Sequence, residues 1–135
     1  MHMNNTYESI KSYQSFPMQM MCVCKSVNDT VGCFEVKTSI DDFCRQSGEV
    51  PLFFFVELLG QAAEMFLKIK EGYTKRYLVE VDDFFVASDI QTYLDRPLEI
   101  KVEMLLKLAK LNKCKVTMRY EGQMCCEGTY IHSCV

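Results

Sequence analysis

The stretch of residues 51–70, P-L-F-F-F-V-E-L-L-G-Q-A-A-E-M-F-L-K-I-K, decides how this chain folds. Its apolar side chains point in nearly every direction around a helix, and only four polar residues interrupt them: Glu57, Gln61, Glu64 and Lys68. This spacing predicts a helix over 52–70 with one narrow polar stripe and an otherwise buried surface. Pro51 is suited to the helix start, where a missing N–H costs nothing, and Gly72 to its C-terminal stop.

The segments around this helix alternate between apolar and polar residues, as strands do. A hairpin is expected before it, with strands over 18–27 and 33–39 joined by a turn at 28–32, after a short helix over 7–13. A polar loop is expected over 41–49. Four strands are expected after the helix, over 77–85, 98–109, 114–120 and 124–132, separated by turns at 95–97, 111–113 and 121–123. Within 98–109, the run M-L-L-K-L-A-K is also good helix sequence.

One helix that is apolar nearly all round needs cover on most sides, and a curved antiparallel sheet supplies it. Each fully buried Phe, Leu or Met contributes roughly 1.5–3 kcal/mol, so this helix supplies much of the folding free energy. With 135 residues and 15.7 kDa, the chain is expected to form a single α+β domain over 1–135. A single sheet leaves one face of the helix open, which a second chain could close.

Charge and hydropathy exclude several classes of partner. The net charge of −3 argues against nucleic acid and against anionic membrane surfaces, both of which attract basic proteins. The most apolar run, 51–67, is interrupted by Glu57, Gln61 and Glu64 and is too short to span a membrane. The first five residues are polar, with no apolar segment of a secretory signal, so we expect a cytoplasmic protein.

The chain has eight cysteines and two histidines, but no C-x-x-C pair. Structural zinc needs four ligands at short, paired spacings, so no metal and no cofactor are expected. Most of the cysteines fall in apolar, strand-like stretches, where a reduced thiol behaves as a small hydrophobic group. The adjacent Cys125 and Cys126 are expected on opposite faces of one strand.

The segment P-L-F-F-F-V-E-L-L-G-Q-A-A, in this order of elements, resembles the hotdog fold, and more narrowly the bacterial 3-hydroxyacyl-[acyl-carrier-protein] dehydratases. In that family the central helix begins with Pro-Gly, places a catalytic Glu six residues after the Pro, and has a Gln four residues later. Pro51, Glu57 and Gln61 match this spacing. S-F-P-M at 15–18, V-D-D-F-F at 81–85, L-D-R-P-L at 94–98 and E-G-Q-M-C-C-E-G-T at 121–129 extend the likeness over roughly residues 10 to 133.

The resemblance implies a homodimer with the two sheets joined edge to edge, and an acyl-thioester site at the interface. Glu57 would be the catalytic group, with Pro51, Leu52, Gln61 and Phe43 lining the substrate site. Two positions depart from the family: Phe43 stands where the family has its catalytic His, and Leu52 stands where the family has the helix-initiating Gly. Cys44, beside Arg45, is a minor candidate to replace the His as nucleophile or acid.

Three functions therefore stay open. The first is a dehydratase-like enzyme that converts 3-hydroxyacyl thioesters to 2-enoyl thioesters in lipid or polyketide-like synthesis. The second is a hotdog thioesterase, which needs one Asp or Glu on the central helix and no His. The third is a non-catalytic partner subunit of an active dehydratase. The expected partners are an acyl-carrier-protein or CoA thioester and a second subunit, identical or related, in a dimer or a higher oligomer.

Overall fold

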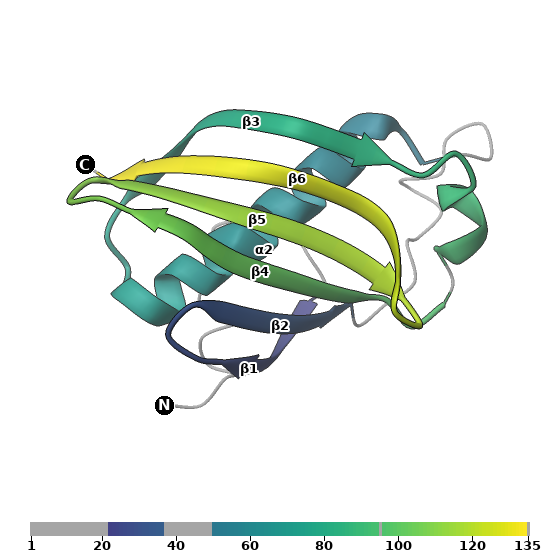
Figure 1. The fold of residues 1–135 in the computed structure, drawn as a ribbon, viewed down its shortest axis with the longest axis horizontal. Helices are drawn as coiled ribbons and strands as arrows, with labels where there is room; N and C mark the ends of the chain where they lie inside the picture. The colour runs from purple at the N-terminus through teal and green to yellow at the C-terminus, as the bar shows by residue number, and fades with distance from the viewer. Residues whose placement is uncertain (1–21, 37–49, 95, 135) are drawn as a thin grey trace.

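The computed structural model describes residues 22–36, 50–94 and 96–134 (Figure 1). Within them the chain forms one long helix, one short 3-10 helix and six strands. In chain order these are β1 (Cys22–Val27), β2 (Val31–Val36), α2 (Leu52–Glu71), β3 (Arg76–Val86), η2 (Ile90–Tyr93), β4 (Glu99–Lys107), β5 (Leu111–Tyr120) and β6 (Gln123–Cys134).

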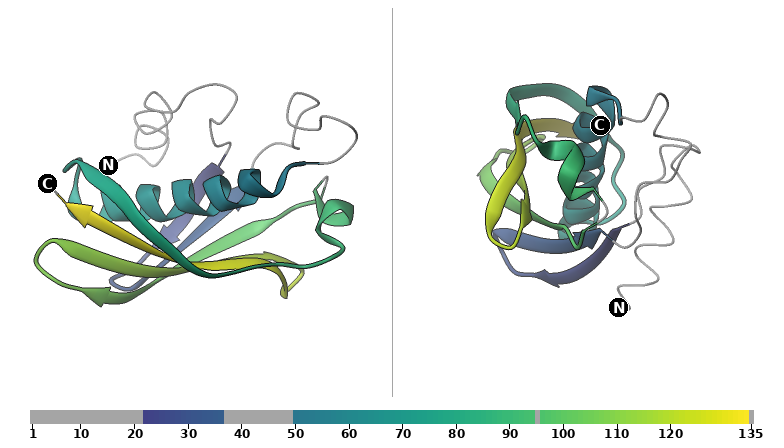
Figure 2. Two further views of the ribbon diagram at one scale, coloured as in Figure 1. Left: turned by 90° about the horizontal axis from the view of Figure 1, so that it is seen from above. Right: turned by 90° about the vertical axis from the view of Figure 1, so that its right-hand side faces the viewer.

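The six strands form one sheet in the order β1-β2-β4-β5-β6-β3, and every neighbouring pair is antiparallel. The sheet curves, and α2 lies along its concave side (Figure 2). β1 and β3 are the two edges. The register of β3 against β6 is irregular in two places, between Leu78 and Glu80 and between Asp82 and Phe85, and Asp83 has a positive φ of 52°. This arrangement confirms the expected helix wrapped by a curved antiparallel sheet.

The helix α2 follows the predicted bounds closely. Pro51 precedes its first residue in an extended conformation and accepts a hydrogen bond from the N–H of Phe54 (3.1 Å). Gly72 ends the helix with φ 86° and donates its N–H to the carbonyl of Lys68 (2.9 Å). A left-handed residue after a helix favours glycine, because other residues carry a Cβ that crowds the backbone there.

The core lies between α2 and the concave face of the sheet. Its largest fully buried side chains include Tyr130, Phe34, Phe55 and Phe66. Gly32 in β2 allows close contact with this core, because a Cβ at that position would lie 2.6 Å from Cδ1 of Phe66. The sheet and the helix are therefore packed closely enough at this point to require a residue without a side chain.

Two details differ from the sequence-based predictions. The β4–β5 turn lies at 108–110, so the prediction of a turn at 111–113 is wrong: Asn112 lies within β5 and its buried amide donates to Glu71 on the helix. The ambiguous run at 104–110 is not helical: it continues β4 as far as Lys107 and then forms the turn, so the prediction of a strand there is confirmed up to Lys107. The short helix η2 was not predicted. The expected helix over 7–13 and loop over 41–49 lie outside the described residues.

The seven cysteines in the described part of the chain are free thiols, and five of them are buried. Burial raises the pKa of both Cys114 and Cys126 to about 12, so these thiols stay protonated at neutral pH. Cys125 and Cys126 are both buried beside a break in the β5–β6 register at Met118. Among the described residues, no helix has the length and hydropathy of a membrane-spanning segment.

Candidate functional site

The predicted carboxyl group and its predicted partner form a pair on α2. Nε2 of Gln61 donates a hydrogen bond to Oε1 of Glu57 (3.2 Å), as side chains four residues apart on a helix can do. Glu57 is exposed in the single chain, whereas Gln61 is 4% exposed. The buried amide of Gln61 thus holds one oxygen of the exposed Glu57 carboxylate and restricts the rotation of that side chain.

The surroundings of this pair are apolar and open to solvent. Leu52 and Phe53 in the first turn of α2 are each 63% exposed, and Phe53 lies one helical turn before Glu57. Large apolar side chains this exposed form the kind of surface that proteins use to bind a ligand or a partner. The described residues therefore do not close the apolar slot that was expected around Glu57.

Tyr130 of β6 supports the helix beneath the pair. Its side chain is buried, and its hydroxyl donates to the carbonyl of Val56, the residue before Glu57. Burial raises the pKa of this phenol, and the neighbouring Cys126 and Glu57 raise it further. Tyr130 therefore stays neutral and acts as a hydrogen-bond donor that fixes the helix at the level of the candidate site.

A residue that the sequence analysis missed fixes the start of α2. Gln91 of η2 accepts a hydrogen bond from the N–H of Val50 (3.1 Å) and donates one to its carbonyl (3.0 Å). Val50 is buried and directly precedes Pro51. The two bonds tie the entry of the helix to a segment 41 residues further along the chain. No sequence motif marks Gln91, because its role depends on a tertiary contact.

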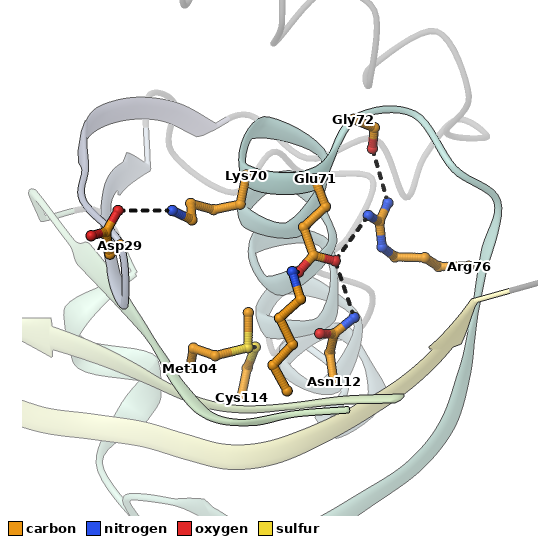
Figure 3. A network of polar contacts seen from close by, with 9 residues as sticks. Asp29, Lys70, Glu71, Gly72, Arg76, Met104, Asn112 and Cys114 are labelled. Atoms are coloured by element: carbon orange, nitrogen blue, oxygen red, sulfur yellow. Dashed lines mark hydrogen bonds and ion pairs between the residues drawn. The ribbon is translucent and has the colours of Figure 1, made fainter. Parts of the chain in front are cut away.

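The polar stripe continues along α2 and ends in a cluster at its C-terminal end (Figure 3). Glu64 and Lys68 form the predicted pair, with Nζ and Oε1 2.9 Å apart. Glu71 then accepts from Arg76 and from Asn112, and it pairs with Lys107. Burial alone would raise the pKa of Glu71, but its bonds to Lys107 and Arg76 outweigh burial and lower it.

The remaining candidates lie away from Glu57 or outside the described residues. Phe43 and Cys44 are not described. His132 is buried in β6, directly opposite Asn112 in the register of β5, near the C-terminal end of α2. The structure thus brings together Pro51, Leu52, Glu57 and Gln61 on the first three turns of α2, and it leaves the described histidine at the other end of the helix.

Comparison by sequence finds no family model and no curated protein that matches this chain. Comparison of folds finds close structural neighbours. The dehydratase heterocomplex ApeI:P from Xenorhabdus doucetiae is similar at a TM-score of 0.71 and 18% identity, covering 90% of this chain and 86% of the other. A hypothetical thioesterase with coenzyme A from Streptococcus pneumoniae is similar at a TM-score of 0.72 and 13% identity, covering 99% and 97%.

Zebra fish thioesterase superfamily member 2 is also similar, at a TM-score of 0.78 and 11% identity, with 100% of this chain and 99% of the other covered. Together with one long helix on a six-stranded antiparallel sheet, these neighbours show that the chain has the hotdog fold. At such low identities the likeness establishes the fold, which dehydratases and thioesterases share. The fold alone does not distinguish these activities.

Proposed function

We propose that this protein binds an acyl thioester along the exposed N-terminal half of α2 and that Glu57 acts on it as an acid–base group. The observation that carries the proposal is the Glu57–Gln61 hydrogen bond beside the exposed side chains of Leu52 and Phe53. A carboxylate held by a buried amide next to open apolar surface combines a proton acceptor with a binding surface for an acyl chain.

Hydrolysis is the reaction for which these residues suffice. Glu57 would accept a proton from water while the water oxygen bonds to the thioester carbonyl carbon. The carbon–sulfur bond then breaks, and the proton passes to the leaving thiolate. Dehydration of a 3-hydroxyacyl thioester needs one group to remove the proton beside the carbonyl and another to protonate the departing hydroxyl. In the dehydratases that the sequence resembles, a His removes the proton beside the carbonyl and the Glu assists protonation of the hydroxyl. Phe43 stands at the position of that His, so the proton-removing group is missing.

A second chain is part of the proposal, because one copy leaves the site open. The edge strand β3 exposes three consecutive apolar residues, Tyr77, Leu78 and Val79, along an edge with which no other described strand pairs. Such an edge favours pairing with another strand. We propose that a second copy pairs there and that its helix encloses Glu57.

The second candidate is a subunit that completes the site of a related dehydratase. It is favoured by the absence of His at position 43 and by a structural neighbour that is a dehydratase heterocomplex. In that case Glu57 would serve in a heterodimer, and the protein alone would turn over neither type of substrate.

The test assays the purified full-length protein with acyl-CoA for thiol release and with 3-hydroxyacyl-CoA for formation of the 2-enoyl product. Glu57→Gln removes the charge at constant shape and is expected to lower turnover about 10²–10⁴-fold. The matched control is Glu64→Gln on the same helix, which should leave turnover near the wild-type rate. Thiol release supports hydrolysis, and enoyl formation supports dehydration.

Turnover that appears only after adding a related dehydratase subunit, and disappears with Glu57→Gln, supports the second candidate. The proposal is overturned if Glu57→Gln and Glu64→Gln behave alike in every assay, or if the wild-type protein neither binds nor turns over an acyl thioester.

A further inference from the structure

The β4–β5 hairpin carries an exposed apolar tip at the end of the molecule away from Glu57 (Figure 1). We define the hairpin tip as residues 105–110, L-L-K-L-A-K, all of which are exposed. Leu105, Leu106 and Leu108 have exposed fractions of 51%, 44% and 53%. Three leucines this exposed within four residues are unfavourable in water, because covering apolar surface is favourable in proportion to the area removed from water.

An irregularity in the strand pairing turns these leucines outward. The β4–β5 register shifts between Met104 and Leu106, so Leu105 is an extra residue in β4. Leu106 then lies opposite Lys113, and Lys107 lies opposite the buried Asn112. Lys107 pairs with Glu71 at the end of α2, which ties the base of the tip to the body of the protein. The tip is thus held out from a fixed base.

The hairpin also carries more lysines than acidic residues. Residues 101–115 contain one acidic residue, Glu103, and five lysines: Lys101, Lys107, Lys110, Lys113 and Lys115. Three of the lysines form ion pairs, Lys101 with Glu103, Lys107 with Glu71 and Lys115 with Glu127. Lys110 and Lys113, at and beside the tip, form no recorded ion pair in the described part of the chain and are the two that can meet an anionic surface. The segment has a net charge of +4, whereas the whole chain has −3. The net charge of the whole chain argued against binding to anionic surfaces. It does not describe this hairpin, which has more basic than acidic residues although the protein is acidic as a whole.

We propose that the hairpin tip inserts its leucines into the surface of an anionic phospholipid bilayer while the flanking lysines bind the headgroups. A convex tip fits a fluid bilayer, which reshapes around it, better than it fits a protein partner, which would need a matching concave pocket. Segments that anchor proteins at the membrane surface combine apolar side chains with lysines, as this tip does. Each lysine near an anionic surface strengthens the binding. The candidate site at Glu57 then lies at the end of α2 that is turned away from the bilayer.

The chain has no tryptophan, so one introduced residue reports on the tip alone. The probe is a vesicle of phosphatidylcholine with about 30% phosphatidylglycerol, an anionic fraction that gives the surface a negative potential. In the full-length Leu106→Trp protein, emission is expected to shift to shorter wavelength with these vesicles and to be quenched by bromine on the acyl chains. The control is Met124→Trp, an exposed position on the β5–β6 hairpin at the opposite end (Figure 1), which should show neither effect.

Cosedimentation with the same vesicles measures affinity. Replacing Lys110 and Lys113 by Gln is expected to weaken binding by about fivefold for each lysine. Replacing all three tip leucines by Ser is expected to weaken it about a hundredfold. Met124→Ser should have no effect, and the thermal melting of every variant confirms that the fold is retained.

Several results would overturn the proposal. One is equal binding to vesicles of phosphatidylcholine alone, with no loss on replacing the lysines. Another is an emission shift of Leu106→Trp that grows with protein concentration in the absence of lipid, which would assign the tip to self-association. A third is tight binding of the tip to an acidic protein with no affinity for vesicles.

Discussion

The cluster at the C-terminal end of α2 allows one substitution to be worked through from the structure. The side chain of Arg76 is 1% exposed, and its guanidinium lies 3.4 Å from Oε1 of Glu71. Replacing Glu71 by Gln keeps the shape and removes the only negative charge that the structure records beside Arg76 in the described residues. Removing one partner of a buried ion pair costs about 3–5 kcal/mol, because the remaining charge stays buried and uncompensated.

Glu71→Gln is expected to lower the free energy of unfolding by about 3 kcal/mol, the lower end of this range, because Arg76 keeps other partners. Arg76 keeps two further hydrogen bonds, to the carbonyls of Gly72 (3.1 Å) and Thr74 (3.0 Å). For a domain of this size, such a loss corresponds to a fall in melting temperature of about 10 °C. Lys107, whose side chain is 60% exposed, is the matched control: Lys107→Gln should cost at most about 1 kcal/mol.

The assay is urea unfolding at pH 7, repeated at lower pH. Because the pKa of Glu71 is lower in the folded protein, its stabilisation is fully present above the unfolded-state value of 4.5 and is lost as the pH falls through the folded value. The wild-type protein should therefore lose more free energy of unfolding on acidification than Glu71→Gln. In a double-mutant cycle, Arg76→Met combined with Glu71→Gln should cost less than the sum of the two. Equal effects of Glu71→Gln and Lys107→Gln, with no coupling to Arg76, would refute the reasoning.

Three further substitutions test other parts of the fold. Burial lowers the pKa of His132, so stability should decline as the pH falls below the unfolded-state value of 6.5, by up to about 1.4 kcal/mol per pH unit, and urea titrations of His132→Asn should show a flatter dependence. Gly32→Ala should cost about 1–3 kcal/mol, measured by thermal melting, since its Cβ would overlap the buried Phe66; an unchanged melting temperature would contradict this packing. Gln91→Leu should speed hydrogen exchange at Val50 and leave the centre of α2 protected; unchanged exchange would show that the two bonds do not hold the helix start.

The long helix was the most predictable element, because its bounds depend on local signals. Pro51 and Gly72 act through backbone geometry alone, and the polar spacing repeats at helical period, so sequence reasoning placed the helix to within one residue. The Glu57–Gln61 and Glu64–Lys68 contacts follow from the same period. The strands after the helix were predictable from alternation, to within a few residues at their ends.

Two of the features that were missed depend on contacts between distant segments. Asn112 suggests a turn by its residue type, but it lies in a strand, where its amide reaches Glu71, 41 residues away. Gln91 holds the start of α2 across the same separation. The helix η2 is short, and hydrogen bonds from Thr92 and Tyr93 to Asp89 support it. It has too few residues to show a helical period of apolar side chains in the sequence. The exposure of Glu57 in the single chain was likewise not readable from its apolar sequence neighbours.

The shape of the edge strand β3 bears on aggregation. Its two register breaks and the left-handed Asp83 bend the strand, so its free N–H and C=O groups do not form one long straight row. A bent edge strand can form backbone hydrogen bonds along its length only with a strand of matching curvature. This disfavours the repeated addition of flat strands that builds an aggregate. An eleven-residue edge with exposed Tyr77, Leu78 and Val79 would otherwise be a template for fibrils. Straightening β3 by removing these breaks should therefore convert a selective edge into an aggregation-prone one.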